Sequence, residues 1–316
     1  MIVTLTPNPS IDRTVSVPAL EHGEVNRASD SRIDPGGKGI NVARALATNG
    51  TEALAVLPSG GPEGHLLQAL LRRSGTAYTA VPIAGTTRMN IAVIEPDGTT
   101  TKLNEPGPTL SADEFDALLA TVDNHLDPDL RWIVGCGSLT PGMPEGIYAD
   151  LVRRGHAHGI KVAIDSSGAP FTAAVPAGPD LIKPNHEELE ELVGRPLHTL
   201  AEVGEAARTL VDGGIETVIV SLGKHGALLV NSVAVAHAIA HVAHPVSTVG
   251  AGDSLVAGYL HAVCRGAGPR EALATGVAWG AAAVSLPGSR MPGPDDIAAI
   301  TVTSTDTPDL TLSLTD

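Results

Sequence analysis

Residues 132–164, WIVGCGSLTPGMPEGIYADLVRRGHAHGIKVAI, read as a strand, a helix and a second strand. Short apolar runs at 132–135 and 162–164 stand on either side of a helical pattern over about residues 144–158. The pattern predicts a βαβ unit, the building block of sheets whose parallel strands are covered by helices.

The same alternation continues along the chain. Further apolar runs occupy residues 2–5, 53–57, 181–182 and 217–221, and helical patterns occur around 39–49, 63–74, 199–212 and 251–265. This order predicts an α/β fold with a mostly parallel central sheet and helices on both faces. Because ligands of such folds bind beyond the carboxyl ends of the strands, we expect the loops after these runs to carry the chemistry.

Two segments, 13–34 and 86–104, lack a helical pattern, and the second reads as a hairpin around Asp97 and Gly98. They predict a small antiparallel sheet that acts as a lid, with plain surface hairpins as the alternative. The main domain is expected over residues 1–300 with these lid segments inserted. The tail 301–316, rich in Thr, Ser and Asp, is either an edge strand or disordered.

The composition excludes several classes of partner. The 316 residues carry a net charge of −15, with 43% apolar and 2% aromatic residues. Such a chain suits neither nucleic acid nor an anionic membrane, because both attract basic surfaces. The absence of a long apolar run and of a basic leader predicts no spanning helix or signal peptide, and therefore a cytoplasmic protein. The two cysteines, Cys136 and Cys264, are expected to be core thiols.

Three common nucleotide and hydrolase motifs are missing. Gly37-Lys38 is followed by Gly39-Ile40, which excludes a P-loop. Leu255 stands where a dinucleotide fingerprint needs its third glycine, and no G-x-S-x-G elbow occurs.

The sharpest local signal is VGAGDS at 249–254, directly before an apolar helical run. The backbone amides of Gly250, Ala251 and Gly252 would lie bare at a helix start, where an anion meets the positive end of the helix dipole. Asp253 can accept a proton from an attacking hydroxyl, or it only caps the helix.

A second glycine turn, DPGGKGIN at 34–41, also leads into a helix. Its three glycines suit a ligand such as a sugar that approaches the backbone closely. Lys38 adds a cation and Asn41 an amide that both donates and accepts hydrogen bonds. The alternative is a flexible turn with a solvated lysine.

Two further turns follow predicted strands. In KPNHEE (183–188), Asn185 fits a helix cap, and Glu188 either closes a capping box or holds Mg²⁺ through water. SLGKHG (221–226) suits nucleotide phosphates, although it also fits a simple hairpin turn.

Three weaker candidates lie near the first strand and in the lid segments. Asp12 can hydrogen-bond sugar hydroxyls or end a turn. Arg27 and Arg88 can grip a phosphate, although exposed arginines are more often solvated.

Taken in order, these residues resemble the ribokinase/PfkB family of sugar kinases. Both signature regions are present, PGGKGINVARAL at 35–46 and STVGAGDSLVAGYL at 247–260. Within the family, TLTPNPSIDRT (4–14), GSLTPG (137–142), KPNHEE, VSLG (220–223) and Lys38 are most similar to the branch that phosphorylates fructose 1-phosphate. Trp279 departs from the small residues that relatives carry near adenine.

The resemblance implies a ribokinase-like three-layer sandwich with a small β-sheet lid, ATP as phosphoryl donor and Mg²⁺ as helper. It makes Asp253 the catalytic base and the amides of Gly250, Ala251 and Gly252 the anion hole. The implied sugar-phosphate residues are Asp12, Arg27, Gly37, Lys38, Asn41, Arg88 and Ser138. The residues implied for ATP are Lys183, Asn185, Ser221, Gly223 and Gly226, with Glu188 on the metal.

The implied reaction phosphorylates the 6-hydroxyl of fructose 1-phosphate, because Arg27, Lys38 and Arg88 suit an acceptor that arrives charged. Kinases of tagatose 6-phosphate or fructose 6-phosphate are the alternatives, and a non-catalytic sugar-phosphate and nucleotide sensor is an alternative of another class. The resemblance also implies a homodimer formed through the lid.

Overall fold

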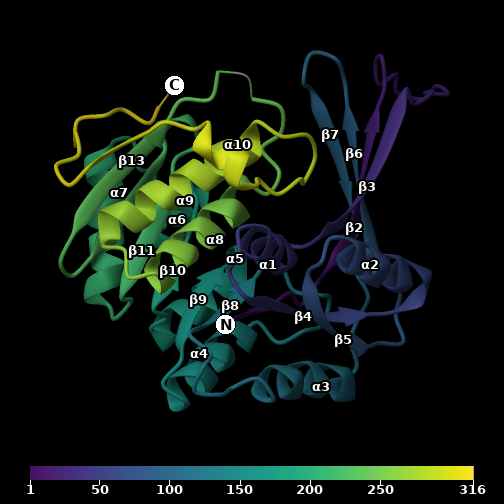
Figure 1. Ribbon diagram of the computed structural model, residues 1–316, viewed down its shortest axis with the longest axis horizontal. Coiled ribbons are helices and arrows are strands. Elements are labelled where there is room, and N and C mark those ends of the chain that lie inside the picture. The colour runs from purple at the N-terminus through teal and green to yellow at the C-terminus, as the bar shows by residue number, and fades with distance from the viewer. Residues whose placement is uncertain (244, 316) are drawn as a thin grey trace.

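The computed structural model describes residues 1–243 and 245–315. A ten-stranded sheet lies between two layers of helices, and a four-stranded sheet projects beside it (Figure 1). The strand order of the large sheet is β14 (Val302–Thr305), β13 (Val235–Ala240), β12 (Ala227–Asn231), β11 (Thr217–Ser221), β10 (Leu181–Ile182), β9 (Lys161–Asp165), β8 (Trp132–Cys136), β1 (Ile2–Leu5), β4 (Ala53–Ser59) and β5 (Ala77–Pro82).

The prediction of a mostly parallel sheet is confirmed. Every neighbouring pair from β5 to β11 is parallel, and β12, β13 and β14 extend the sheet with antiparallel pairs. Strand β14 is the edge strand that was one of the two alternatives for the tail, whereas strands β12 and β13 were not predicted. The reason is that β13, VAHAIA, is rich in alanine and lacks the β-branched run that marks a strand.

Helices cover both faces of this sheet, which accounts for the nearly uninterrupted apolar strands. One face carries α1 (Lys38–Thr48), α2 (Gly61–Arg73), α8 (Ala251–Cys264) and α9 (Pro269–Val284), and the short α10 (Pro294–Ala298) follows α9. The other face carries α3 (Ala112–Asp123), α4 (Ile147–Ala157), α5 (Gly168–Ala174), α6 (His186–Val193) and α7 (Leu200–Asp212). Along β1, Ile2 packs into the first layer and Val3 into the second, so the pleat divides the core in two.

The two cysteines differ in burial. Cys136 is buried at the end of β8, whereas Cys264 at the end of α8 is only half-buried, so the expectation of a core thiol holds fully for Cys136 alone. Among the described residues, no helix has the length and hydrophobicity that crossing a bilayer requires.

The small sheet has the order β3 (Asp30–Gly36), β2 (Ser10–Ser16), β6 (Arg88–Ile94) and β7 (Thr100–Asn104). The expected antiparallel pairing is confirmed for β3 with β2 and for β6 with β7, whereas the central strands β2 and β6 run parallel. Strands β1 and β5 of the body are parallel to each other in their sheet, and each continues through a short link into β2 or β6. The two lid strands therefore leave the body in the same direction.

The hairpin predicted around Asp97 and Gly98 is confirmed between β6 and β7. Gly98 adopts a φ of 90°, and its amide donates to the Glu95 carbonyl over 2.9 Å. At the C-terminus, β14 forms the outer edge of the large sheet, and residues 310–314 then run beside the start of α7. The amide of Leu200 donates to the carbonyl of Leu312 over 3.0 Å in that contact.

Helices α8 and α9 approach closely because glycines face each other between them. A Cβ atom on Gly258 would lie 2.7 Å from the Trp279 ring and 3.0 Å from the Cα atom of Gly276. The Trp279 side chain is buried in this contact, with its ring centroid 5.1 Å from that of His261. The packing fixes the position of α8, whose first turn carries the strongest functional motif of the sequence.

Two helical glycines should therefore respond oppositely to alanine. Gly258→Ala forces α8 away from α9 and should lower the free energy of unfolding by about 1 to 3 kcal/mol. In Gly204→Ala, the new methyl group would meet only the Leu228 side chain at 3.8 Å, so the variant should gain about 0.5 to 1 kcal/mol from its reduced unfolded-state entropy. Urea unfolding measures both values. A Gly258→Ala variant as stable as the parent protein would contradict the packing described here.

Candidate active site

Strands β9 and β10 end in a buried charge cluster. Asp165 is the last residue of β9 and Lys183 follows β10 directly, while Lys38 begins α1. The Nζ atoms of Lys38 and Lys183 lie 2.9 and 3.5 Å from the same oxygen, Oδ1 of Asp165. Neighbouring parallel strands end at one edge of a sheet, which brings these residues together although they are far apart in sequence.

The cluster keeps Asp165 ionised. Burial alone would raise the pKa of Asp165, but the charges of Lys183 and Lys38 outweigh it and lower the pKa. Burial likewise acts to lower the pKa of Lys38, and the carboxylates of Asp165 and Asp253 raise it instead. Both lysines therefore direct their charge chiefly at Asp165.

Asp253 lies in the first turn of α8 and is buried, at 6% exposure. Its Oδ2 atom accepts a hydrogen bond of 2.9 Å from the side-chain amide of Asn41. Burial, followed by the negative charge of Asp165, raises the pKa of Asp253 from 3.8 to about 6, against the opposing influence of Lys38, Asn41 and Lys183. A carboxylate with this pKa is mostly ionised at pH 7 and still has a useful affinity for a proton.

The capping alternative for Asp253 is wrong. Gly250 is the N-cap of α8, with a left-handed φ of 76°, and the first turn has no side-chain cap. The carboxylate instead points toward Asn41 of α1. Helix capping therefore does not explain why the Asp253 carboxylate is buried.

The amides at the start of α8 are largely open. Among the described residues, the backbone amides of Gly250 and Gly252 donate to no protein acceptor, whereas that of Ala251 makes a long bond of 3.4 Å to the Thr248 carbonyl. A Cβ atom on Gly252 would lie 3.5 Å from the Lys183 Nζ atom, so a cation stands beside these amides. An anion placed here would meet open donors, the helix dipole and an ammonium group.

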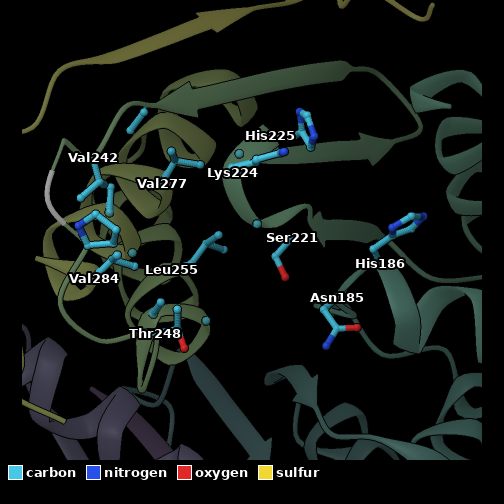
Figure 2. A pocket seen from close by; sticks show the side chains of 18 of the residues that line it. Asn185, His186, Ser221, Lys224, His225, Val242, Thr248, Leu255, Val277 and Val284 are labelled. Atoms are coloured by element: carbon cyan, nitrogen blue, oxygen red, sulfur yellow. The ribbon is translucent and has the colours of Figure 1, made fainter. Parts of the chain in front are cut away.

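A cavity of about 890 Å³ begins at Ala251 and Gly252 and extends toward the antiparallel edge of the sheet. Four of the five residues predicted to bind ATP line it: Asn185, Ser221, Gly223 and Gly226. Figure 2 shows Asn185 and Ser221 on one side of this cavity and Leu255, Val277 and Val284 on the other. The fifth, Lys183, lies buried beneath its inner end with Asp165.

The apolar wall of the cavity corrects the expectation for Trp279. The residues of α9 that face the cavity are Val277, Gly280, Ala281 and Val284. Trp279 lies on the side of α9 that packs against α8, so its ring does not reach the cavity. On α9, this wall therefore consists of glycine and small aliphatic side chains.

The turn at 221–226 is a hairpin between β11 and β12, in which Gly223–His225 form the 3₁₀ turn η2. Gly226 has a φ of 79°, and a Cβ atom there would lie 2.0 Å from the Ala238 carbonyl. Only glycine fits this position. The hairpin interpretation of the turn is confirmed, and the turn also lines the cavity, while its binding of nucleotide phosphates stays a prediction.

Asn185 and Glu188 form the predicted capping box at the start of α6. The Glu188 amide donates to Asn185 Oδ1 over 2.7 Å, and the Asn185 amide donates to Glu188 Oε2 over 2.8 Å. The second carboxylate oxygen of Glu188 is not used in the box. The Oδ2 atom of Asp165 is buried and has no hydrogen-bond partner within the described structure.

Asp12 belongs to the lid and faces the glycine turn. Its Oδ1 atom accepts hydrogen bonds from Ser10 Oγ over 2.7 Å and from Asn90 Nδ2 over 3.1 Å. A Cβ atom on Gly36 would lie 2.3 Å from the Asp12 carboxyl carbon. The space that Gly36 leaves at the end of β3 is thus filled by the Asp12 carboxylate of the neighbouring strand β2. Gly37, with a φ of 118°, caps α1 against Thr6.

The predicted phosphate-binding arginines lie in different surroundings. Arg88 is partly buried, and it donates to the carbonyls of Glu105 and Asn8 over 3.0 Å each, while its buried Nε atom has no partner among residues 1–243 and 245–315. Burial lowers the pKa of Arg88, and the nearby Asp12 opposes this. Arg27 is exposed in the loop between β2 and β3, and no bond within the described residues connects it to the site. Ser138 is exposed in the loop after β8, next to Gly137, where an added Cβ atom would lie 3.8 Å from the Lys38 Cβ atom.

Sequence reasoning missed two polar residues of this site, Asp165 and Asn90. The signal for Asp165 was present, because it directly follows the apolar run 162–164, where chemistry was expected. Asn90 sits among apolar residues of the lid strand β6, and no sequence signal marks it.

Comparison with known proteins identifies the class. The model of the pfkB family carbohydrate kinases matches residues 6–296. A 1-phosphofructokinase from Rhodobacter capsulatus is 37% identical, with 96% of each chain covered, and ATP-dependent 6-phosphofructokinase isozyme 2 from Escherichia coli is 36% identical, with 95% of this chain and 97% of the relative covered. The crystal structure of phosphofructokinase-2 from Escherichia coli with substrates and products superposes with a TM-score of 0.90, at 35% identity, covering 94% of this chain and 97% of that one. The protein is thus a carbohydrate kinase. It belongs to the pfkB family.

Replacement of the buried carboxylate should stabilise the protein. Because the folded pKa of Asp253, about 6, exceeds the ordinary 3.8, the folded state binds its proton more tightly than the unfolded chain. Ionisation of Asp253 therefore lowers the free energy of unfolding progressively as the pH rises from about 4 to about 6. Above that range the loss of stability stays constant. Asp253→Asn should melt a few degrees above the parent protein at pH 7.5, with the difference shrinking toward pH 5. A variant that melts lower at pH 7.5 would contradict this.

Proposed function

We propose that this protein transfers the γ-phosphoryl group of ATP to the 6-hydroxyl of fructose 1-phosphate, giving fructose 1,6-bisphosphate and ADP. The relatives named 1-phosphofructokinase, from Rhodobacter capsulatus and other organisms, support this substrate. The single observation that carries the proposal is the buried Asp253, with its raised pKa, next to open amides at the inner end of the cavity.

Asp253 acts as the general base in this proposal. Its carboxylate accepts the proton of the 6-hydroxyl as that oxygen bonds to the γ-phosphorus and the bond from the γ-phosphorus to ADP breaks. Asn41 holds the carboxylate in place. A general base of this kind contributes roughly 10² to 10⁴ in rate.

The amides of Gly250 and Gly252, assisted by Ala251, stabilise the charge of the transferred group. Phosphoryl transfer spreads negative charge over the equatorial oxygens, so fixed donors matter more than covalent chemistry. Loss of one such donor typically costs about 10² to 10³ in rate. The ammonium groups of Lys183 and Lys38, which both lie near Asp165 Oδ1, add positive charge to the site.

We assign the sugar phosphate to the space between the glycine turn and the lid. Asp12, Gly37, Asn41 and Ser138 would contact the sugar, and Lys38, Arg88 and Arg27 its phosphate. Arg88 supports the assignment, because its buried Nε atom has no partner in the described structure. Arg27 requires the loop that carries it to approach the body, since that loop is exposed.

ATP would lie along the cavity, held by Asn185, Ser221, Gly223 and Gly226, with Lys183 at its phosphate end. The residues present also fit Mg²⁺, because Asp165 offers an unpartnered oxygen and the charge of Glu188 acts on the same Lys38. We propose that both carboxylates hold the ion, with Glu188 acting through water. Bound there, Mg²⁺ would neutralise charge on the nucleotide phosphates.

We further propose a homodimer formed through the lid, in the cytoplasm, where ATP is available. The exposed apolar side chains of the lid support the dimer: Leu20, Val25, Ile33 and Leu103. A relative, phosphofructokinase-2 from Escherichia coli, has a tetrameric inhibited form.

The direct test incubates the purified protein with Mg-ATP and one hexose phosphate at a time, following ADP release. Fructose 1-phosphate should give the highest kcat/KM, above fructose 6-phosphate and tagatose 6-phosphate. A preference for either of the other two would overturn the substrate assignment. Binding without turnover for all three would identify a sensor instead.

Arg88→Ala should weaken binding of the sugar phosphate. Loss of a charged hydrogen bond is worth about 1.5 to 3 kcal/mol, so the KM for fructose 1-phosphate should rise about tenfold or more while the KM for ATP stays constant. Arg13→Ala is the matched control, since Arg13 lies on the adjacent strand β2 and is exposed. If the KM for fructose 1-phosphate is the same in Arg88→Ala and Arg13→Ala, Arg88 has only a structural role.

A further inference from the structure

The structure points to Arg44 as a positioning residue, which we propose holds the amide of Asn41 in the one orientation that lets Asn41 donate to Asp253. This inference rests on the proposed role of Asp253 as the base. Arg44 lies on α1, one turn beyond Asn41, and both side chains are buried, at 8% and 4% exposure. Its Nη1 atom lies 3.2 Å from Asn41 Oδ1, and Asn41 Nδ2 lies 2.9 Å from Asp253 Oδ2.

The orientation of an asparagine amide needs such a partner. The two ends of the amide have nearly the same shape but opposite hydrogen-bonding roles. A guanidinium group carries donors only, so the oxygen of Asn41 must face Arg44 and its NH₂ group must face Asp253. In the reversed orientation, the amide oxygen would face a carboxylate and the NH₂ group would face a cation.

The burial of Arg44 is difficult to explain by packing alone. Among the described residues, Arg44 forms no ion pair, because its neighbour Asp34 is engaged by Arg32 over 2.7 Å. Burial lowers the pKa of Arg44 against the attraction of Asp34, because a buried charge loses its hydration.

Arg44 also connects the parts of the site that must stay in register. The same Nη1 atom lies 3.2 Å from the carbonyl of Pro35, in the glycine turn, and 3.1 Å from that of Ser289. The loop that contains Ser289 continues to Met291, whose methyl group would lie 3.3 Å from a Cβ atom on Gly250. Arg44 thus reaches the substrate turn, the partner of the base and a loop beside the anion hole.

The test compares the pH dependence of kcat/KM for fructose 1-phosphate in Arg44→Gln and the parent protein. Glutamine can donate and accept, so the Asn41 amide is free to turn over. The acid limb of the profile, where kcat/KM falls at low pH, reports the pKa of the base in the free enzyme. In Arg44→Gln this limb should move up by about one pH unit, as expected when a carboxylate loses a hydrogen bond. Turnover should fall roughly tenfold to a hundredfold, and the KM for ATP should not change.

Several groups face Asp253, namely Asn41, Asp165, Lys38 and Lys183, and none of them is altered in Arg44→Gln. The substrate phosphates titrate identically in both assays, so the difference between the limbs belongs to the protein. Arg44→Lys, which again offers donors only, should restore the parental limb. If Arg44→Gln fails to fold, Arg44→Met removes the donors while keeping an unbranched side chain.

Asn49→Ala is the matched control for a loosened α1. The Asn49 side chain donates to the Pro292 carbonyl over 2.9 Å, so it ties the same helix to the same loop without touching Asn41. This variant should lose some stability and keep the parental acid limb.

The decisive comparison is between Asn41→Ala and the double variant that also carries Arg44→Gln. The acid limb should lie at the same pH in both, because the amide that Arg44 orients is absent from both. An unmoved limb in Arg44→Gln alone, or an equal movement in the Asn41→Ala background, would overturn the positioning role.

The pKa of Asp253 can also be read without turnover, from the ¹³C carboxyl resonance that is missing in Asp253→Asn. In Arg44→Gln this resonance should titrate about one pH unit higher than in the parent protein. The readout separates the two claims: a protein with no kinase activity would refute the proposed function, while an unchanged titration would refute the positioning role.

Discussion

The site depends on how two carboxylates and two ammonium groups pair with each other. Both lysines lie against Asp165, so within the described part of the chain Asp253 is left with an amide partner and no direct ion pair. Had either lysine bound Asp253 instead, the pKa of that carboxyl would be lowered and its affinity for a proton lost. The division of partners between Asp165 and Asp253 therefore sets which carboxylate stays ionised and which one can accept a proton.

The fold produces this division through close backbone approach. Parallel strands β9 and β10 end side by side and deliver Asp165 and Lys183, while α1 and α8 bring Asn41 and Asp253 together across the first helical layer. Helix α8 can occupy that place because Gly258 and Gly276 let α9 pack tightly behind it. The same helix start leaves amides open toward the cavity, so packing and anion binding both follow from the position of α8.

Local patterns predicted much of this arrangement. The βαβ alternation gave the parallel sheet, and glycines before an apolar helix marked the start of α8. Asp165 was missed although it directly follows an apolar run, because the lysines that give it its importance come from neighbouring elements. The direction of β6 beside β2 and the side of α9 that Trp279 occupies were likewise set by tertiary packing. Arg44 resembles an ordinary helix residue until its contacts with Asn41 and Ser289 are known.

The central claim is that phosphoryl transfer takes place between the open amides of α8 and Asp253. A crystal structure with ADP, aluminium fluoride and fructose 1-phosphate tests it most directly, because the planar fluoride occupies the position of the transferred group. We expect the fluoride to accept hydrogen bonds from the amides of Gly250 and Gly252, with the 6-hydroxyl of the sugar bonded to Asp253. A fluoride bound away from these amides, or a sugar that turns a different hydroxyl toward Asp253, would contradict the account.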